Sequence, residues 1–134
     1  MRLLVVLLAF FCMSVALFLR QDTELSQSKK RGAAVFEDFC INCHMANGEG
    51  VPEVYPPLAK SDYLANNRTA SIRGVKFGQR GPMVVNGVTY DNTMMPLGLD
   101  DDEIADVMNF ILNSWGNKND SLVTPAEVAA VGPR

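Results

Sequence analysis

Cys40-Ile41-Asn42-Cys43-His44 is the most informative stretch of this 134-residue sequence. Its two cysteines stand three positions apart, and a histidine follows the second one directly. His44 is the only histidine of the chain, and Cys12 is the only other cysteine. Residue types as rare as these seldom meet at this spacing by chance, so the stretch predicts a specific chemical site.

The C-x-x-C-H pattern predicts covalent attachment of one c-type haem. The thiols of Cys40 and Cys43 would add to the two vinyl groups of the porphyrin as thioethers. The imidazole of His44 would then bind the iron from the proximal side. The predicted cofactor is therefore haem c with its iron. Cys40, Cys43 and His44 are its predicted binding residues, and His44 is a predicted metal ligand.

Two other uses of a C-x-x-C pair fit less well. A thioredoxin-like dithiol is expected in a βαβ context in the cytosol. A zinc site needs four ligands, which a second pair of cysteines or histidines usually supplies. Cys12 lies in an apolar N-terminal segment, and the chain has no further cysteine or histidine. Haem attachment is the favoured interpretation.

The N-terminus predicts a targeting segment over residues 1–20. An uncharged apolar run from Leu3 to Leu19 is flanked by Arg2 and Arg20. This length is at the lower limit for a membrane-spanning helix, and Ser14-Val15-Ala16 offers a signal-peptide cleavage site. Because the apolar run continues past that site, an uncleaved membrane anchor is slightly favoured over a cleaved signal. Either alternative predicts export to an oxidising compartment.

Composition indicates one small domain that does not bind nucleic acid. The chain has 12 Lys and Arg against 15 Asp and Glu, a net charge of −3. Residues 1–20 hold two of the arginines and no acid, which leaves −5 for the remainder. Nucleic-acid-binding domains are typically basic. The negative charge either steers the domain towards positive docking partners or merely solvates its surface.

Hydrophobic patterning predicts a mainly helical domain over residues 29–134, after a polar linker at 21–28. A helix is expected from Lys29 to Phe39, with a costly glycine at Gly32 that indicates close approach of another element. A turn at 61–64 precedes a helix from Asn67 to about Lys76. Residues 84–90 alternate around Asn86-Gly87, which predicts a hairpin.

The last long helix is the clearest predicted element. Asp100 and Glu103 form a pair resembling a capping box at its start, and Gly116 is expected to end it. Its buried stripe has helical spacing and comprises Ile104, Val107, Met108, Ile111 and Trp115. Residues 124–127, Thr-Pro-Ala-Glu, predict the start of a short final helix.

The second axial ligand of the iron is expected to be a methionine, because no second histidine exists. Met83, Met94 and Met95 are the remaining candidates, and Met94 and Met95 lie between the hairpin and the last helix. Met95 is the first choice because Pro96 would stiffen the backbone that holds its sulfur. Met94 is the main alternative, and packing in an apolar loop remains open for each. The predicted metal ligands are thus His44 and Met95.

Together these motifs resemble a class I c-type cytochrome over about residues 29–118. The motifs that carry the resemblance are Gly32 with Phe36, Cys40-Ile41-Asn42-Cys43-His44, Tyr55-Pro56-Pro57-Leu58, Met95-Pro96, and Phe110 with Trp115. Residues 47–52 and 85–90 are more narrowly similar to small monohaem modules that serve bacterial periplasmic oxidoreductases. A departure from the family pattern is Met45, where a small residue is common.

The resemblance implies an all-α cytochrome c fold. Three to five helices would surround one covalent haem, with a short hairpin before the distal methionine loop. It also implies that the first and last helices cross at Gly32, Phe36 and Phe110. A proline carbonyl, with Pro56 favoured over Pro57, would accept a hydrogen bond from the proximal His44 and so count among the cofactor-binding residues.

The implied function is electron transfer by a haem with His/Met axial ligands between periplasmic or membrane-bound redox partners. The protein would be an electron carrier rather than an enzyme, on the periplasmic side of a bacterial inner membrane. Arg73, Lys76 and Arg80 are candidate partners of the haem propionates, with surface solvation as the alternative. A haem with an open distal site, peroxidase-like or gas-sensing, is the rival function.

Overall fold

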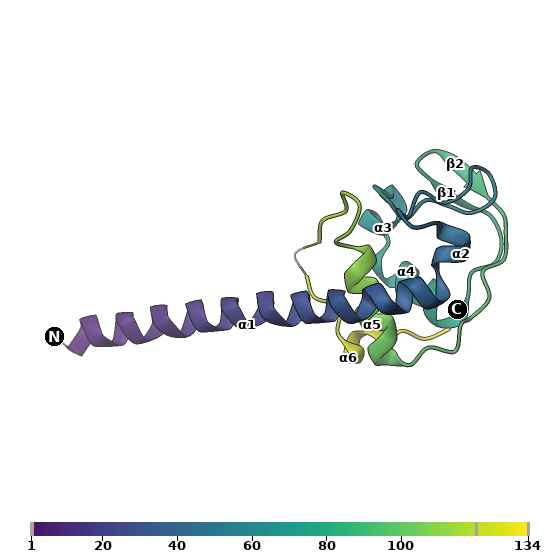
Figure 1. Ribbon diagram of the computed structural model, residues 1–134. Helices are drawn as coiled ribbons and strands as arrows, with labels where there is room; N and C mark the ends of the chain where they lie inside the picture. Colours follow the sequence, from purple (N-terminus) through teal and green to yellow (C-terminus); the bar gives the residue numbers. More distant parts are fainter. Residues whose placement is uncertain (1, 120, 134) are drawn as a thin grey trace.

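The computed structural model describes residues 2–119 and 121–133. A long helix, α1 (Arg2–Phe39), projects from a small body formed by the rest of the chain (Figure 1). The remaining elements are α2 (Ile41–His44), α3 (Asp62–Asn66), α4 (Arg68–Phe77), β1 (Met83–Val85), β2 (Val88–Tyr90), α5 (Asp101–Ile111) and α6 (Pro125–Ala130). This architecture confirms the expected all-α class with one short hairpin.

Helix α1 is longer than the sequence predicted. The expected helix began at Lys29 after a linker, but residues 21–28 continue the helix without a break. The physical reason is that this polar segment contains neither glycine nor proline, so nothing in it interrupts helical hydrogen bonding. Ser28 is already buried, with 5% of its surface exposed. The contacts of the body with α1 therefore begin inside the predicted linker.

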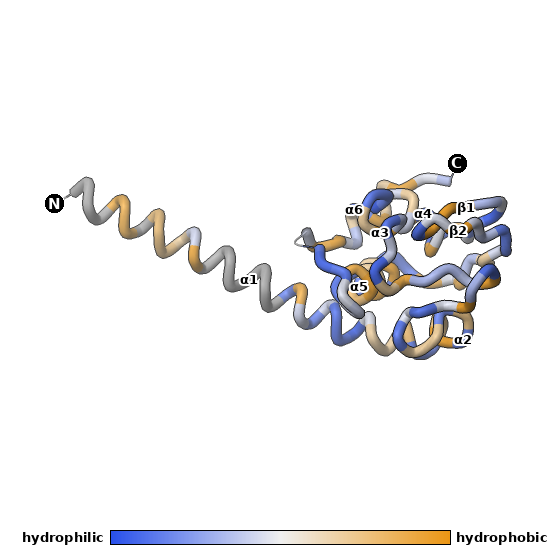
Figure 2. The backbone as a smooth tube through the Cα atoms, turned by 90° about the horizontal axis from the view of Figure 1, so that it is seen from above, coloured by the Kyte–Doolittle hydropathy of each residue, from blue (hydrophilic) through white to orange (hydrophobic). Residues whose placement is uncertain are grey.

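The first half of α1 carries the predicted targeting segment, and Met1 lies outside the described residues. Figure 2 shows apolar residues along this part of the helix, well away from the body. Val6, Leu7, Leu8, Phe10, Phe11 and Met13 are all exposed. Among the described residues, no helix is long and apolar enough to cross a membrane.

The body is organised by the crossing of α1 and α5. A Cβ atom added at Gly32 would overlap the backbone carbonyl of Asp106 and lie 2.9 Å from Cβ of Phe110. Phe36 is 3% exposed, and its ring centroid lies 5.5 Å from that of Phe110. The predicted crossing of these residues is confirmed, and the close approach of the two helices explains why a helix interior contains glycine.

A buried polar cluster joins the same two helices on one side of the crossing. Asp106 is only 8% exposed, and its carboxylate accepts bonds from the Ser28 hydroxyl at 2.7 Å and from Arg31 at 2.5 and 2.7 Å. Asn109 is fully buried and donates to the Ser28 hydroxyl at 2.9 Å. Because the buried polar groups are all paired, the cluster fixes the crossing without an unsatisfied charge.

Helix α5 begins as predicted but ends earlier. Asp100 and Glu103 form a complete capping box, in which each side chain accepts from the other residue's backbone N–H. The helix ends at Ile111, and Trp115, predicted on its buried stripe, lies beyond it with a φ of 51°. The chain turns here because Asn117 bonds the carbonyl of Ile111 at 2.7 Å. Trp115 still packs on the core, with its ring centroid 5.0 Å from that of Phe36.

The hairpin and the final helix agree with prediction. β1 and β2 are antiparallel, with Val85 paired to Val88 around Asn86 and Gly87. Both turn residues have positive φ, 50° and 80°, as the favoured two-residue hairpin turn requires. Thr124 caps α6, and its hydroxyl accepts from the N–H of Glu127 at 3.2 Å.

Residues 121–133, here called the C-terminal strap, lie across α4 and α5. The strap buries three valines, Val123, Val128 and Val131. Arg68 at the start of α4 binds both carboxylate oxygens of Glu127, at 2.6 and 2.8 Å, and two strap carbonyls. Asn109 of α5 exchanges two hydrogen bonds of 2.8 Å with the backbone of Val123. The strap therefore fixes α4 against α5.

Candidate functional site

The C-x-x-C-H stretch lies directly after α1. Cys40 is the turn between α1 and α2, and α2 is the single helical turn that ends at His44. The N–H of His44 donates to the carbonyl of Cys40 at 2.9 Å. Both thiols are free, with Cys40 half-buried and Cys43 exposed. One helical turn therefore presents two thiols and an imidazole from a single short segment.

The segment after His44 folds back on it through backbone hydrogen bonds. Gly50 N–H donates to the carbonyl of His44 at 3.0 Å, and Leu58 N–H donates to that of Gly48 at 2.7 Å. A Cβ at Gly50 would overlap the carbonyl of Tyr55 and lie 2.8 Å from that of Pro56. Gly50 also has a φ of 66°. The close return of the chain therefore requires glycine here, because a side chain would overlap the backbone and because other residues rarely adopt this φ.

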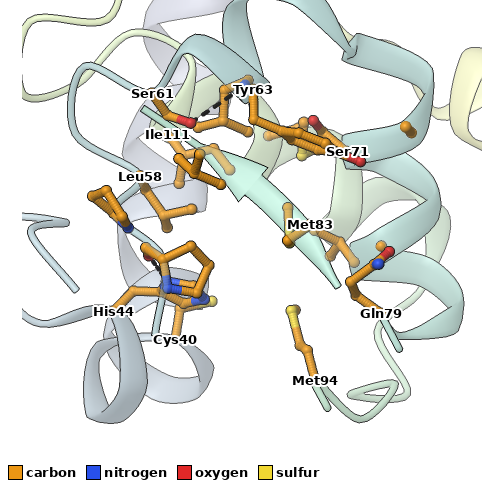
Figure 3. Close-up of a pocket in the computed structure, with 18 of the residues that line it drawn as sticks. Cys40, His44, Leu58, Ser61, Tyr63, Ser71, Gln79, Met83, Met94 and Ile111 are labelled. Carbon is orange, nitrogen blue, oxygen red and sulfur yellow. Dashed lines mark hydrogen bonds between the residues drawn. The ribbon is translucent and has the colours of Figure 1, made fainter. Parts of the chain in front are cut away.

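The loop brings the Pro56 carbonyl oxygen to 3.0 Å from Nδ1 of His44, the hydrogen bond that the family resemblance implied (Figure 3). A carbonyl only accepts, so Nδ1 carries the proton and Nε2 presents a lone pair. Burial lowers the pKa of His44, and the bond to Pro56 opposes that shift. The imidazole is thus kept neutral, in the form that binds a metal.

The electrostatics of the cysteines argue against a thiol oxidoreductase. Burial raises the pKa of Cys40 to about 11, with a further contribution from Cys43. Reactive dithiols instead have a lowered thiol pKa, because the thiolate is the nucleophile. Among the residues that the structure describes, no group of three or more histidine, cysteine, aspartate or glutamate side chains is arranged to hold a metal. The zinc interpretation therefore gains no support.

A deep apolar cleft opens beside His44 (Figure 3). Its inner part is walled by α4 and α5 and by the segment after His44, through residues that include Leu58, Leu64, Val75, Val107, Met108 and Ile111. Its outer part is bordered by residues that include Phe39, Cys43, Val54, Tyr55, Met95 and Leu97. Cys40, His44, Pro56, Gln79, Met83 and Met94 border both parts, so the two form one continuous cleft.

The apolar lining of the cleft and the open space beside Gly74 fit a large apolar group. Gly74 sits within α4 on the cleft wall, and a Cβ there would meet only Cβ of Gln79, at 4.0 Å. No crowding by the described residues explains this glycine, although it costs a helix about 1 kcal/mol relative to alanine. Space left for a bound group does explain it. The sequence shows this glycine inside the predicted helix. Its role becomes clear only when the structure places it on the wall of the cleft.

Met94, rather than the predicted Met95, faces His44. In Figure 3 the sulfur of Met94 points into the cleft from the side opposite His44. Met95 is 57% exposed and borders only the outer part. Met94 pairs with Gln79 in a two-bond antiparallel bridge, 2.9 Å for each bond. Successive side chains of such extended backbone point to opposite sides, so Met95 is directed away when Met94 points in. Of the two neighbouring methionines, Met94 is therefore the one that the cleft geometry places opposite His44.

Two of the three cations suggested for the propionates are engaged elsewhere. Arg73 donates to the carbonyl of Gly132 at 3.1 Å. Lys76 donates to the carbonyl of Val128 at 2.8 Å and forms an ion pair with Asp101 at 2.9 Å. Both side chains hold the C-terminal strap against α4, and Lys76 also holds α5 there. Arg80 is exposed and follows Gln79, which borders the cleft, so it remains the candidate of the three.

Comparison with known proteins agrees with the haem-attachment motif. The family model for cytochrome c matches residues 29–115. The chain is 35% identical to cytochrome c-552 of Thermus thermophilus over 98 residues, which is 69% of this chain and 66% of that protein. It is 34% identical to the cytochrome c subunit of the quinone alcohol dehydrogenase of Gluconacetobacter polyoxogenes over 72% of this chain. It is also 32% identical to the CcoP subunit of the cbb3-type cytochrome c oxidase of Rhodobacter capsulatus over 74% of this chain.

The share of each relative that is matched differs greatly. The chain spans about two thirds of the Thermus protein, but only 21% of the alcohol dehydrogenase subunit and 35% of the oxidase subunit. The similarity to the two larger proteins is thus a similarity to one part of each.

Proposed function

The chain belongs to the cytochrome c family as a small class I c-type module that transfers electrons on haem c, and from this premise we propose that His44 and Met94 are the axial ligands of its iron. Cys40 and Cys43 would hold the haem covalently, and Pro56 would orient the proximal ligand through its bond to His44. The haem supplies a one-electron couple between Fe(II) and Fe(III). The observation that carries the proposal is the position of Met94, across the cleft from His44.

The protein's own groups favour this ligand pair. The hydrogen bond from Nδ1 of His44 to Pro56 leaves Nε2 unprotonated and fixes the plane of the ring. The bridge between Gln79 and Met94 fixes the backbone that carries the sulfur. A thioether is a soft ligand and raises the potential of the couple. The apolar cleft wall excludes water, which disfavours the more highly charged ferric centre and acts in the same direction.

We further propose that the protein carries electrons without acting as an enzyme. With His44 and Met94 both bound to it, the iron would have no position left for a substrate. Its redox partners would be oxidoreductases or oxidases, since cytochrome c subunits of such complexes are among its relatives. A peroxidase-like site would require a distal base, and His44 is the only histidine of the sequence.

The proposed location is the periplasmic side of a bacterial inner membrane. Supporting features are the apolar run at residues 3–19 and its exposed side chains on α1, Val6, Leu7, Leu8, Phe10, Phe11 and Met13. Exposed apolar side chains in this number disfavour a free aqueous helix, because their burial stabilises by about 25 cal/mol per Å². The proposed division is a targeting segment at 1–20, followed by the cytochrome domain with its C-terminal strap.

Matched methionine variants test the ligand assignment. Met94→Ala should abolish the far-red ferric absorption band of sulfur-ligated haem, lower the reduction potential, and allow carbon monoxide to bind the ferrous iron. Met95→Ala should do none of these. Ligand loss in Met95→Ala with a retained band in Met94→Ala would refute Met94 and restore the sequence prediction. Failure of the wild type to attach haem covalently would refute the central assignment.

A further inference from the structure

Two Asn-Gly pairs occur in the sequence, Asn47-Gly48 and Asn86-Gly87. The amide carbon of an asparagine side chain is open to attack by the backbone nitrogen of the next residue. Glycine at that next position obstructs the attack least, because it has no Cβ atom. Both pairs therefore have the chemistry for spontaneous deamidation, and their surroundings in the fold decide which of them reacts.

The first pair is held in a fixed position. Gly48 is buried, and a Cβ atom added to it would lie 2.6 Å from the ring of Trp115. Its N–H donates to the carbonyl of Met45 at 3.0 Å, and its carbonyl accepts from the N–H of Leu58 at 2.7 Å. The nitrogen that would attack Asn47 is thus engaged in a hydrogen bond, and the backbone around it has no room to turn.

The second pair is open. Asn86 and Gly87 are the two exposed turn residues between β1 and β2. A Cβ atom added to Gly87 would meet no atom within 4 Å. In the described part of the chain, the N–H of Gly87 forms no backbone–backbone hydrogen bond. The nitrogen that would attack Asn86 is therefore not held by the hairpin, and it has space around it.

Asp62, the first residue of α3, contacts Asn86 through two hydrogen bonds. The N–H of Asp62 donates to Oδ1 of Asn86 at 3.0 Å, and the carboxylate of Asp62 accepts from the N–H of Asn86 at 2.7 Å. We call these two bonds the turn clamp. Attack on the side-chain carbon places negative charge on Oδ1, and a donor already directed at that oxygen stabilises the charge. The turn clamp therefore favours the reaction at Asn86.

We propose that Asn86 is a site of spontaneous deamidation in the folded protein and that Asn47 is protected from it. The backbone nitrogen of Gly87 forms a bond to Cγ of Asn86, and the bond between Cγ and Nδ2 breaks. The proton of the attacking nitrogen leaves with Nδ2 as ammonia. Water then opens the cyclic imide at either of its two carbonyl carbons, which yields aspartate or isoaspartate at position 86.

Either product weakens the turn clamp. A carboxylate at position 86 meets the carboxylate of Asp62, and like charges in contact repel. Isoaspartate also adds a carbon atom to the backbone of a two-residue turn. The turn clamp joins two walls of the cleft, since α3 contributes Leu64 and β1 contributes Val85 to its lining. Deamidation at Asn86 is therefore expected to loosen the distal side of the cleft.

Peptide mapping by mass spectrometry tests the modification in the full-chain holoprotein. The protein is incubated at mildly alkaline pH, where amide nitrogens lose their proton more readily, and both Asn-Gly peptides are analysed for conversion to aspartate and isoaspartate. In the folded protein, conversion at Asn86 should be about tenfold faster than at Asn47 or more, because only Asn47 is held by its surroundings. In urea, where the fold no longer distinguishes the two pairs, their rates should be similar.

The variant Asn86→Asp mimics one product and keeps a turn sequence, Asp-Gly, that hairpins favour. Because β2 leads into the segment that carries Met94, imidazole should replace this methionine about threefold faster in the ferric variant than in the wild type. The exchange variant Asp62→Asn/Asn86→Asp keeps one carboxylate and one amide in the turn clamp, and it should restore the wild-type rate. This consequence rests on the proposed ligation by Met94, whereas the deamidation does not.

Contrary results fall into three kinds. Equal conversion at Asn47 and Asn86 in the folded protein, or conversion in urea alone, would overturn the proposed modification site. A wild-type replacement rate in Asn86→Asp, or a raised rate that persists in the exchange variant, would overturn the proposed loosening by charge repulsion. A wild type without the sulfur-ligation band would refute Met94 as the ligand, and the peptide map would still decide the modification of Asn86.

Discussion

The two sides of the cleft are built in different ways. On the proximal side, residues 40–59 return repeatedly to their own backbone, through bonds that include those of Gly48, Gly50 and Leu58. On the distal side, residues 79–97 are held by the bridge between Gln79 and Met94 and by the β1–β2 hairpin. Within the part of the chain that the structure describes, residues 95–97 form no backbone–backbone hydrogen bond.

The two candidate ligands are therefore kept in place in different ways. His44 is positioned by a local hydrogen-bond network, in which its ring nitrogen, its carbonyl and its N–H all have protein partners. Met94 has two backbone bonds, and its side chain extends alone into the cleft. We expect the proximal side to limit the stability of the fold and the distal side to limit the retention of the sixth ligand.

The largest expected effect comes from crowding the proximal side. Gly50→Ala places a methyl group against the carbonyl of Tyr55 at a φ of 66°. Overlap with backbone and the unfavourable φ together should cost about 3 kcal/mol or more in unfolding free energy. Urea titration of the ferric holoprotein measures this loss.

The matched control for that variant lies on the distal side. Gly98 has a φ of 74°, but an added Cβ there would meet no atom within 4 Å. Gly98→Ala should therefore cost only the backbone term, about 1–2 kcal/mol. Equal losses for the two variants would contradict the proposed difference between the sides.

A smaller loss of stability is expected from Asn117→Ala, because Asn117 holds the end of the proximal segment at Leu58. The side-chain amide of Asn117 donates to the carbonyls of Leu58 and Ile111, at 2.7 Å each. Asn117→Ala leaves both carbonyls without this partner, which should cost about 1–3 kcal/mol. The midpoint of thermal unfolding should fall while the sulfur-ligation band stays. Loss of the band at low temperature would show that this residue also supports the distal side.

A still smaller change in stability should follow from Asn92→Ala. Its side chain forms one exposed bond, to Val54, between the two sides of the cleft mouth. Loss of an exposed neutral bond should cost about 0.5–1 kcal/mol. The clearer signal should be faster replacement of Met94 by imidazole in the ferric protein. A wild-type replacement rate in this variant would mean that the distal side does not depend on the contact.

The smallest effect concerns a contact that belongs to neither side. The bond to Arg68 lowers the pKa of Glu127 below its ordinary value of 4.5. The contribution of the Arg68–Glu127 pair to the free energy of unfolding is therefore complete above about pH 4.5. It is lost as the pH falls through the lowered pKa of Glu127. Glu127→Gln should cost about 0.5–1 kcal/mol at pH 7, because the pair is partly exposed.

The same variant and the wild type should converge in stability at a pH below the lowered pKa of Glu127, as measured by denaturant titration across pH. A constant difference between them down to that pH would mean that the contact does not act through ionisation of Glu127. The sulfur-ligation band should be the same in both proteins at pH 7.

Local signals in the sequence predicted a large part of the fold. The Asn86-Gly87 hairpin, the cap at Asp100 and the cap at Thr124 each depend on a few neighbouring residues. Gly32 predicted a close approach because a glycine inside a helix needs a reason. The pentapeptide at 40–44 predicted the family, which the comparisons then showed.

The remaining features depend on contacts between distant residues. The choice between Met94 and Met95 is set by the bridge to Gln79, and no local pattern marks that pairing. The uses of Arg73 and Lys76 are set by strap carbonyls more than 50 positions away. The early end of α5 depends on Asn117 reaching Leu58 and Ile111 at once.

The C-terminal strap has a consequence for the order in which the protein is assembled. The thiols and imidazole at 40–44 and the loop that orients them are complete within residues 40–59, early in the chain. The strap contacts that fix α4, the wall of the cleft, join residues as far apart as Arg68 and Glu127. Closing so long a loop is entropically costly. The haem-attachment segment can therefore form while the cleft is still open, and the strap, which is synthesised later, closes it.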